Sequence, residues 1–256
     1  MADIVTFRQA LERCGISQAS ARVAITDQGY TNIEEFAELS EKDIVDLIVK
    51  VINRLPAPAE DVAPPRVPFA STKKLKAFRN WKWERAWCGL GFAHGDFTDQ
   101  ELTRMIQRMD FLAQQKMNEL DSPPLPEKFS TFGTKWRLFK EAIHGHLAVK
   151  RGCIDVPLIY VLRDHQVVTD AMRDADYGDS DEYLINVVSL TTDAFKQDNA
   201  RVWEIVRPLL YGTPAWDYVK TYDRTKNGRM ALRVLERRGE GEAALDARRT
   251  KAETTL

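Results

Sequence analysis

Apolar residues recur at three- and four-residue intervals along most of this chain, which is the spacing of one face of an α-helix. In the first 55 residues these runs are short, and Gly15 and Gly29 end the first two. Ser40 and Asp43 then predict a capping box, because a hydroxyl and a carboxylate three residues apart can each bond a free backbone N–H. The stripe that follows comprises Ile44, Leu47, Ile48, Val51 and Leu55. We expect shorter helices to cover it, so that residues 1–55 form a small helical domain that folds alone.

The order of short helices closed by a longer amphipathic one, with the segment LSEKDI (39–44) before the last, resembles a sterile alpha motif (SAM) domain. A generic helical bundle is the alternative, because any capped helix after a turn can produce the same sequence pattern. SAM-like domains commonly self-associate or bind other proteins. The resemblance therefore implies an interaction domain with a protein partner.

Five prolines lie between Leu55 and Ser71: Pro56, Pro58, Pro64, Pro65 and Pro68. Proline removes a backbone donor and disfavours helix in the residue before it. Residues 56–71 therefore predict an extended linker and a domain boundary.

From residue 72 to about residue 241 the helical spacing resumes, with a proline-rich break at residues 121–126 and little to suggest a sheet. Residues 156–163 are β-branched and aromatic. In the absence of a partner strand, we expect a buried extended segment or a short helix there. The acidic residues 174–181 predict a hinge between two lobes, residues 72–173 and 182–241, followed by a charged tail, residues 242–256. The predicted fold class is all-α: a SAM-like bundle, a linker and a two-lobed helical region.

Charge is nearly balanced over the 256 residues, with a formal net charge of −1, so contact with nucleic acid must be local rather than a property of the whole chain. The basic stretch after residue 72 offers five candidate RNA-binding residues: Lys73, Lys74, Lys76, Arg79 and Lys82. Phe78 and Trp81 lie among them and can stack on bases, although core packing at helical spacing is the competing interpretation.

The sequence lacks the patterns that are typical of several classes of protein. Cys14, Cys88 and Cys153 are far apart and form no C-x-x-C pair, which argues against a disulfide framework and a zinc module and favours a reducing compartment. No signal-peptide pattern opens the chain, and no apolar run reaches the length of a membrane helix. We therefore expect a cytoplasmic protein.

Catalytic motifs are also missing, including the phosphate-binding glycine loops, H-E-x-x-H and G-x-S-x-G. His144 and His146 are two residues apart, which places them on different faces of a helix. The acidic pairs between Asp174 and Glu182 lack the closing glutamate of an EF-hand loop. We predict no catalytic, cofactor-binding or metal site.

Ordered motifs mark the second half of the chain: PLIYVLR (157–163) and, in the last third, AFKQDNARVW (194–203), GTPAW (212–216) and NGR (227–229). In this order they resemble the Gag-like capsid region of copia-type LTR retrotransposons. The motif positions are Phe195, Asp198, Asn199, Trp203, Trp216, Gly228 and Arg229. Trp203 also lies on an apolar stripe with Val206 and Leu210, so we expect it in the core.

The resemblance implies a structural capsid protein of a transposable element, which self-assembles, packages element RNA and does no chemistry. It implies that the main partner is the chain itself, that RNA binds weakly and without sequence preference, and that no membrane is involved. The chain departs from the family where Arg238 and Gly239 replace a histidine and an aromatic, and it lacks a zinc knuckle. The alternative is a cellular adaptor that uses the SAM-like domain for protein–protein interaction.

Overall fold

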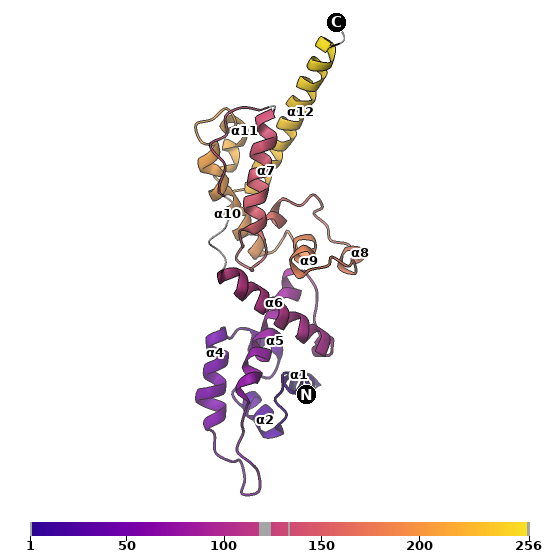
Figure 1. Ribbon diagram of the computed structural model, residues 1–256. Helices are drawn as coiled ribbons and strands as arrows, with labels where there is room; N and C mark the ends of the chain where they lie inside the picture. Colours follow the sequence, from indigo (N-terminus) through magenta and orange to yellow (C-terminus); the bar gives the residue numbers. More distant parts are fainter. Residues whose placement is uncertain (1, 118–123, 133, 255–256) are drawn as a thin grey trace. The chain divides into compact units, whose positions relative to one another are not determined.

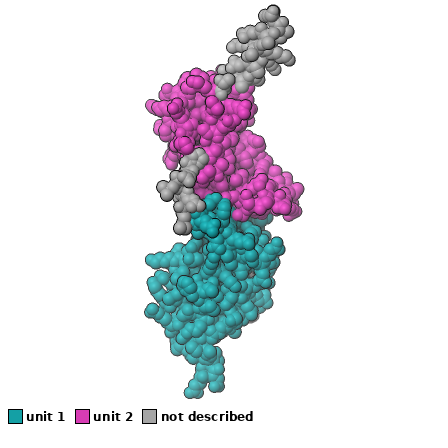
Figure 2. All heavy atoms as spheres, in the orientation of Figure 1, with its two compact units in different colours: residues 1–117 teal, residues 118–256 magenta. Residues whose placement is uncertain are grey.

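The computed structural model describes residues 2–117, 124–132 and 134–254 (Figure 1). Within those ranges the regular elements are helices, and the backbone adds one isolated β-bridge, between Arg151 and Pro157. The prediction of an all-α fold is confirmed. The chain forms two compact units, residues 1–117 (unit 1) and residues 118–256 (unit 2), shown in different colours in Figure 2. None of the helices in the described ranges combines the length and apolar character of a membrane span.

Unit 1 contains six α-helices among its described residues, together with short π- and 3₁₀-helical segments. They are α1 (Ala2–Arg13), α2 (Ala19–Asp27), α3 (Ile33–Ala37), α4 (Glu41–Asp46), η1 (Leu47–Val51), η2 (Ile52–Arg54), α5 (Phe69–Trp87), η3 (His94–Asp96) and α6 (Asp99–Met117). The predicted capping box opens α4, where the Ser40 hydroxyl accepts from the Asp43 N–H and the Asp43 carboxylate accepts from the Ser40 N–H.

The core of unit 1 extends beyond the predicted domain of residues 1–55. Phe7 of α1 and Phe36 of α3 both contact the ring of Phe78 on α5, with centroids 6.2 and 6.3 Å apart, and all three side chains are fully buried. Helix α6 packs on α5 in turn. The structure therefore places the division of the chain after Met117 and not at residues 56–71, because Phe78 of α5 packs on apolar rings of α1 and α3.

The proline-rich segment contains no helix before Phe69, as its composition predicts, yet it is tied to unit 1. The amide nitrogen of Gln18 donates to the Pro64 carbonyl at 2.9 Å, and its amide oxygen accepts from the Arg66 N–H at 2.8 Å. Asn53 makes a similar pair of bonds with the backbone of Val67, at 3.0 and 2.6 Å. The segment is thus a surface loop within unit 1.

Unit 2 is built from α7 (Thr134–Val149), η5 (Leu158–Leu162), α8 (Asp170–Arg173), α9 (Ser180–Val187), α10 (Asp193–Leu210), α11 (Trp216–Val219), η6 (Lys220–Tyr222) and α12 (Gly228–Thr254). The first part of the predicted break, residues 121–123, lies outside the described residues. Residues 124–132 contain no helix.

Residues 156–163 take the second of the two predicted forms, a short buried helix. Element η5 is a 3₁₀-helix, and Leu158, Tyr160 and Val161 are fully buried in it. It packs against α7, α10 and α12, and α9 also contacts it. Residues 134–173 therefore share one core with residues 182–241. The sequence pattern instead predicts two separate lobes, residues 72–173 and 182–241. The reason is that η5 lies between helices from both segments.

Helix α12 continues through Gly239, although glycine often ends a helix, and its backbone remains helical to Thr254. An ideal Cβ at position 239 would lie 2.2 Å from the Trp136 ring of α7. Glycine at this position allows α12 to approach α7 closely, so here it serves packing and not termination.

Candidate functional site

The motif position Asp198 joins α10 to the segment that contains η5. Its side chain is 1% exposed, and its carboxylate accepts from the Cys153 N–H at 2.8 Å and from the Tyr160 hydroxyl at 3.0 Å. Burial raises the pKa of Tyr160 well above its usual range, and the Asp198 charge adds to the rise. The hydroxyl therefore stays protonated and remains a donor to the carboxylate.

Asn199, the next motif position, joins α10 to the start of α12. Its side-chain oxygen accepts from the Arg229 N–H at 2.8 Å, and its nitrogen donates to the Asn227 side chain at 3.2 Å. Asn227 also accepts from the Met230 N–H at 3.0 Å. These contacts satisfy backbone donors of the first turn of α12, which have no partner within the helix.

Gly228 and Trp203 mark the closest approach of α10 and α12. An ideal Cβ at position 228 would lie 2.5 Å from the Trp203 backbone nitrogen. Trp203 is 1% exposed, which confirms its expected place in the core, and its indole N–H donates to Asp223 at 3.2 Å. Its ring stacks on Trp216 of α11, with centroids 6.2 Å apart.

The remaining motif positions complete the same assembly. Phe195 is half-buried and contacts the Tyr160 ring, with centroids 6.4 Å apart. Arg229 is buried, and its Nη1 donates to the Val161 carbonyl of η5. We call the set of contacts made by the seven motif residues the α10–α12 joint. The structure links all seven through contacts within unit 2: Asp198, Trp203, Gly228 and Arg229 are buried, and Phe195, Asn199 and Trp216 are half-buried.

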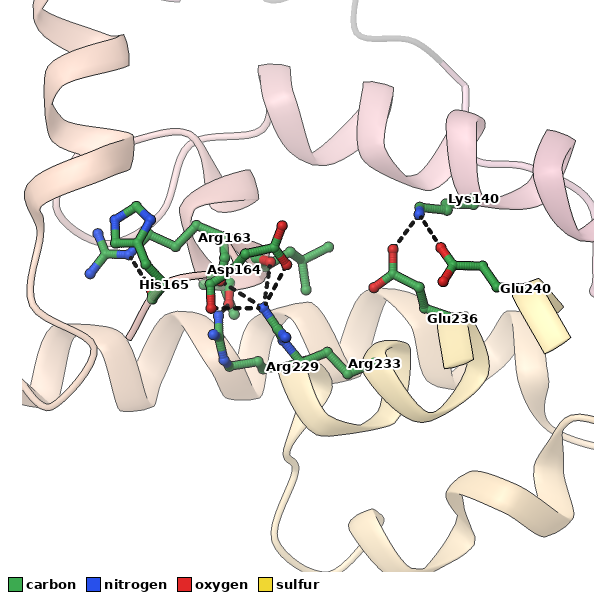
Figure 3. Close-up of polar contacts among 10 residues, drawn as sticks. Lys140, Arg163, Asp164, His165, Arg229, Arg233, Glu236 and Glu240 are labelled. Carbon is green, nitrogen blue, oxygen red and sulfur yellow. Dashed lines mark hydrogen bonds and ion pairs between the residues drawn. The ribbon is translucent and has the colours of Figure 1, made fainter. Parts of the chain in front are cut away.

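Two arginines one turn apart on α12 hold the end of η5 (Figure 3). Beside the bond from Arg229 to Val161, Nη2 of Arg233 donates to the Arg163 carbonyl at 2.8 Å and to the Asp164 carboxylate at 3.2 Å. Cations are favourable beside the free carbonyls at a helix end. Burial lowers the pKa of Arg229 to about 10, and the neighbouring Arg233 charge contributes.

Lys140 of α7 points between two carboxylates of α12, those of Glu236 and Glu240 (Figure 3). The bond to Glu236 raises the pKa of Lys140, although burial opposes the rise. The ammonium group is therefore charged and paired on both sides, so it holds α7 against α12.

A cleft of about 380 Å³ lies between α7, η5, α9 and α12. Its charged lining falls into two groups, Lys140 with Glu236, and Arg233 with Arg163 and Asp164 (Figure 3). His144 also lines it, and burial together with the Lys140 charge lowers the pKa of this histidine. The apolar lining consists of Trp136, Phe139, Ile143, Ile159, Leu162, Ile185 and Leu232.

Sequence reasoning did not identify this cleft. The four-residue spacing of Arg229 and Arg233, repeated by Glu236 and Glu240, does indicate one charged face of a helix. The partner of Arg233 is a carbonyl 70 residues earlier in the chain, and nothing in the sequence pattern marks it.

The five predicted RNA-binding residues lie on α5, where they point in different directions around the helix. Lys73 pairs with Asp110 at 2.6 Å, and Lys76 pairs with Glu41 at 3.3 Å. Arg79 donates to the Leu39 carbonyl at 2.5 Å, Lys82 lies over the Trp83 ring, and Lys74 lies beside Gly15. They do not form one open basic face.

The aromatic side chains interleaved with these cations are part of the core. Phe78 and Trp81 are fully buried, so the core interpretation is confirmed for both and base stacking on them is excluded. In the acidic segment, the Asp179 carboxylate accepts from the N–H groups of Asp181 and Glu182 and so caps α9. Within the described residues, no group of three or more His, Cys, Asp and Glu side chains is placed to hold a metal ion.

Comparisons of the chain with protein-family models, with curated proteins and with solved structures found no match.

Proposed function

We propose that this chain is a structural, self-associating protein of the Gag type, which assembles into particles and encloses RNA. The observation that carries the proposal is the α10–α12 joint. Motif residues from α10, α11 and α12, which together resemble the copia-type capsid region, are linked by one set of contacts within unit 2. Chance matches at scattered surface positions would not be expected to contact one another.

The chemistry of the joint supports a structural role and not a catalytic one. Asp198 and Asn199 direct their polar atoms at backbone N–H groups and at the Tyr160 hydroxyl. Groups already used in this way are not open to a substrate. The joint instead fixes how the helices of unit 2 pack on one another. Identical folded units build rings or lattices when their contacts do not close pairwise.

The test is the size distribution of the full chain over a series of protein and salt concentrations, with and without RNA. Analytical ultracentrifugation and negative-stain microscopy should show oligomers that grow into shells or extended lattices. A monodisperse monomer under all of these conditions would refute the proposal.

RNA enclosed by such particles would be held without sequence preference. Its affinity should then fall steeply with salt and should be the same for unrelated single strands, because phosphate contacts release counterions. Fluorescence anisotropy with two labelled oligonucleotides of different sequence measures both properties. Strong preference for one of them would contradict this part of the proposal.

The alternative function is that of a cellular adaptor, and the start of unit 1 favours it. The capped helical stretch from α4 to η2 follows the shorter helices α1 to α3, which is the order on which the SAM resemblance rests. An adaptor would remain monomeric or dimeric and bind a different protein. The neighbouring coding sequence separates the two functions, because protease and polymerase frames downstream indicate an element.

A further inference from the structure

Two guanidinium N–H groups beside the cleft of unit 2 have no hydrogen-bond acceptor among the described residues. They are Nη2 of Arg229 and Nε of Arg233, and both atoms are buried. Arg229 is only 5% exposed as a residue, whereas Arg233 lines the cleft directly. Buried donors without acceptors are rare in folded proteins, and they indicate a site where a polar group is expected.

The charge of these two arginines is also poorly balanced. Within the described part of the chain, Asp164 is the carboxylate in ion-pair distance of Arg233, and its side chain is fully exposed to solvent. No carboxylate in that part lies as close to Arg229. The backbone carbonyls of Val161 and Arg163 satisfy individual donors but carry no net charge. An anion in the cleft beside Arg233 would supply the missing charge.

The opposite side of the cleft does not compete for such an anion. Lys140 is already paired with Glu236 and Glu240 (Figure 3). The two carboxylates and the single ammonium group make that side unfavourable for a second negative charge. The preferred position for an anionic group is therefore at the Arg233 side.

Between these two charged sides the lining of the cleft is apolar, from Phe139 and Ile143 on α7 to Leu232 on α12. A cleft of about 380 Å³ with apolar walls and a few polar groups has the character of a small-molecule site. It suits a ligand with an apolar body and one polar end.

We propose that this cleft binds a small apolar monocarboxylate, whose chain packs on α7 and α12 and whose carboxylate accepts hydrogen bonds from Arg233. A carboxylate matches the planar fork of a guanidinium group. Arg229 lies one turn earlier on α12 and adds positive charge behind Arg233. This binding activity is independent of self-assembly, since it requires only the interior of unit 2.

Isothermal titration calorimetry of the full chain with octanoate, 1-octanol and octylamine tests the proposal. Octanoate should bind saturably with one site per chain, at least about ten-fold more tightly than the alcohol, because a hydrogen bond to a charged group is the stronger kind. The amine should give no saturable binding. Between hexanoate and octanoate, each added methylene should tighten binding about three- to four-fold. Equal binding of acid and alcohol, preference for the amine, or no saturable heat would overturn the proposal.

Three variants locate the site. Ile185→Trp fills the cleft from α9 at a half-buried position, and it should abolish binding of both octanoate and octanol while leaving the melting temperature unchanged. Arg233→Gln should weaken octanoate at least about ten-fold and leave octanol unaffected. Arg237→Gln, at an exposed position one turn further on, is the matched control and should bind octanoate as the wild type does.

Arg233 also holds the end of η5, so its loss could alter the fold. Arg233→Lys, which keeps the positive charge, should retain the preference for acid over alcohol even if the chain melts at a lower temperature. Unchanged octanoate binding by Ile185→Trp, or loss of the acid preference in Arg233→Lys as complete as in Arg233→Gln, would contradict the proposed position of the carboxylate.

Discussion

In unit 1 a cluster of buried aromatic rings around Phe78 holds several helices together, whereas in unit 2 the buried motif residues Asp198 and Arg229 bond to the backbone. Phe78 of unit 1 contacts Phe7, Phe36 and Phe97, and the last of these rings lies 4.6 Å away between centroids. Unit 1 also buries Glu84, but its partners Arg104 and Arg108 are side chains of the facing helix α6.

The polar contacts of unit 2 are of another kind. Asp198 accepts from a backbone N–H, Arg229 donates to a backbone carbonyl, and Gly228 lies against the backbone of α10. An apolar core tolerates exchange among side chains of similar volume. A side chain that bonds to the backbone is harder to replace, because no second substitution can alter its backbone partner. This difference explains why unit 2 carries short motifs and unit 1 carries mainly periodicity.

The largest expected effect tests whether unit 1 folds only with α5. We expect a fragment of residues 2–117 to melt cooperatively. A fragment of residues 2–55 should show no cooperative transition, because it lacks Phe78, which packs on Phe7 and Phe36. Circular dichroism over temperature measures both. A cooperative melt of the shorter fragment near the temperature of the longer one would show that the first four helices form a complete core.

The next effect separates side-chain partners from backbone partners. Asp198→Ala should lower the free energy of unfolding by about 3 kcal/mol or more, because the Cys153 N–H and the Tyr160 hydroxyl lose a charged acceptor. Glu84→Ala should cost a similar amount, about 3–5 kcal/mol, since it leaves buried arginine charge on α6 uncompensated. Chemical denaturation of each variant gives these values.

Double variants test whether stability returns when both side chains of a contact are replaced. Glu84→Leu combined with Arg108→Met should restore unit 1 to about its original stability, because apolar residues can replace a buried ion pair. Asp198→Ala combined with Tyr160→Phe should remain destabilised, since no side-chain change removes the Cys153 N–H. Full recovery of the second pair would mean that the backbone contact contributes little.

The smallest effect is a pH dependence in unit 2. His144 faces Lys140 on its own helix, Glu236 on α12 and Asp164 after η5, and burial lowers its pKa below the ordinary value of about 6.5. The folded state then binds fewer protons than the unfolded state, so stability is complete above about pH 6.5 and falls as the pH drops below it. His144→Gln should remove this decline, with a change of less than about 1 kcal/mol. A variant with the same slope between pH 7 and pH 5 as the wild type would exclude His144 as its source.

Local features of the sequence were sufficient for several elements. The capping box of Ser40 and Asp43 and the apolar stripe that contains Trp203, Val206 and Leu210 both depend on neighbours within a few residues. Helix signals of this kind act over one or two turns, so periodicity and capping chemistry express them directly.

Elements whose roles depend on distant partners were predicted less well. Prolines between Leu55 and Ser71 indicated a boundary, but Gln18 and Asn53 hold that segment to unit 1. Gly239 is a residue type that often ends a helix, but α12 continues through it, and the close Trp136 ring leaves no room for a side chain there. The local preference was correct about the backbone at the prolines and wrong at Gly239, and in neither place did it indicate the partner.

The sequence by itself therefore determined that the chain is helical, where several of its helices begin, and which residues make up the motifs of its last third. Only the tertiary structure decided that α5 completes the first core, that η5 joins two predicted lobes into one unit, and that Arg229 and Arg233 meet the carbonyls of residues 161–163 beside a cleft. The physical reason is range. Helix formation and capping depend on contacts a few residues apart, whereas packing and charge pairing depend on groups that the fold brings together from as many as 100 residues away.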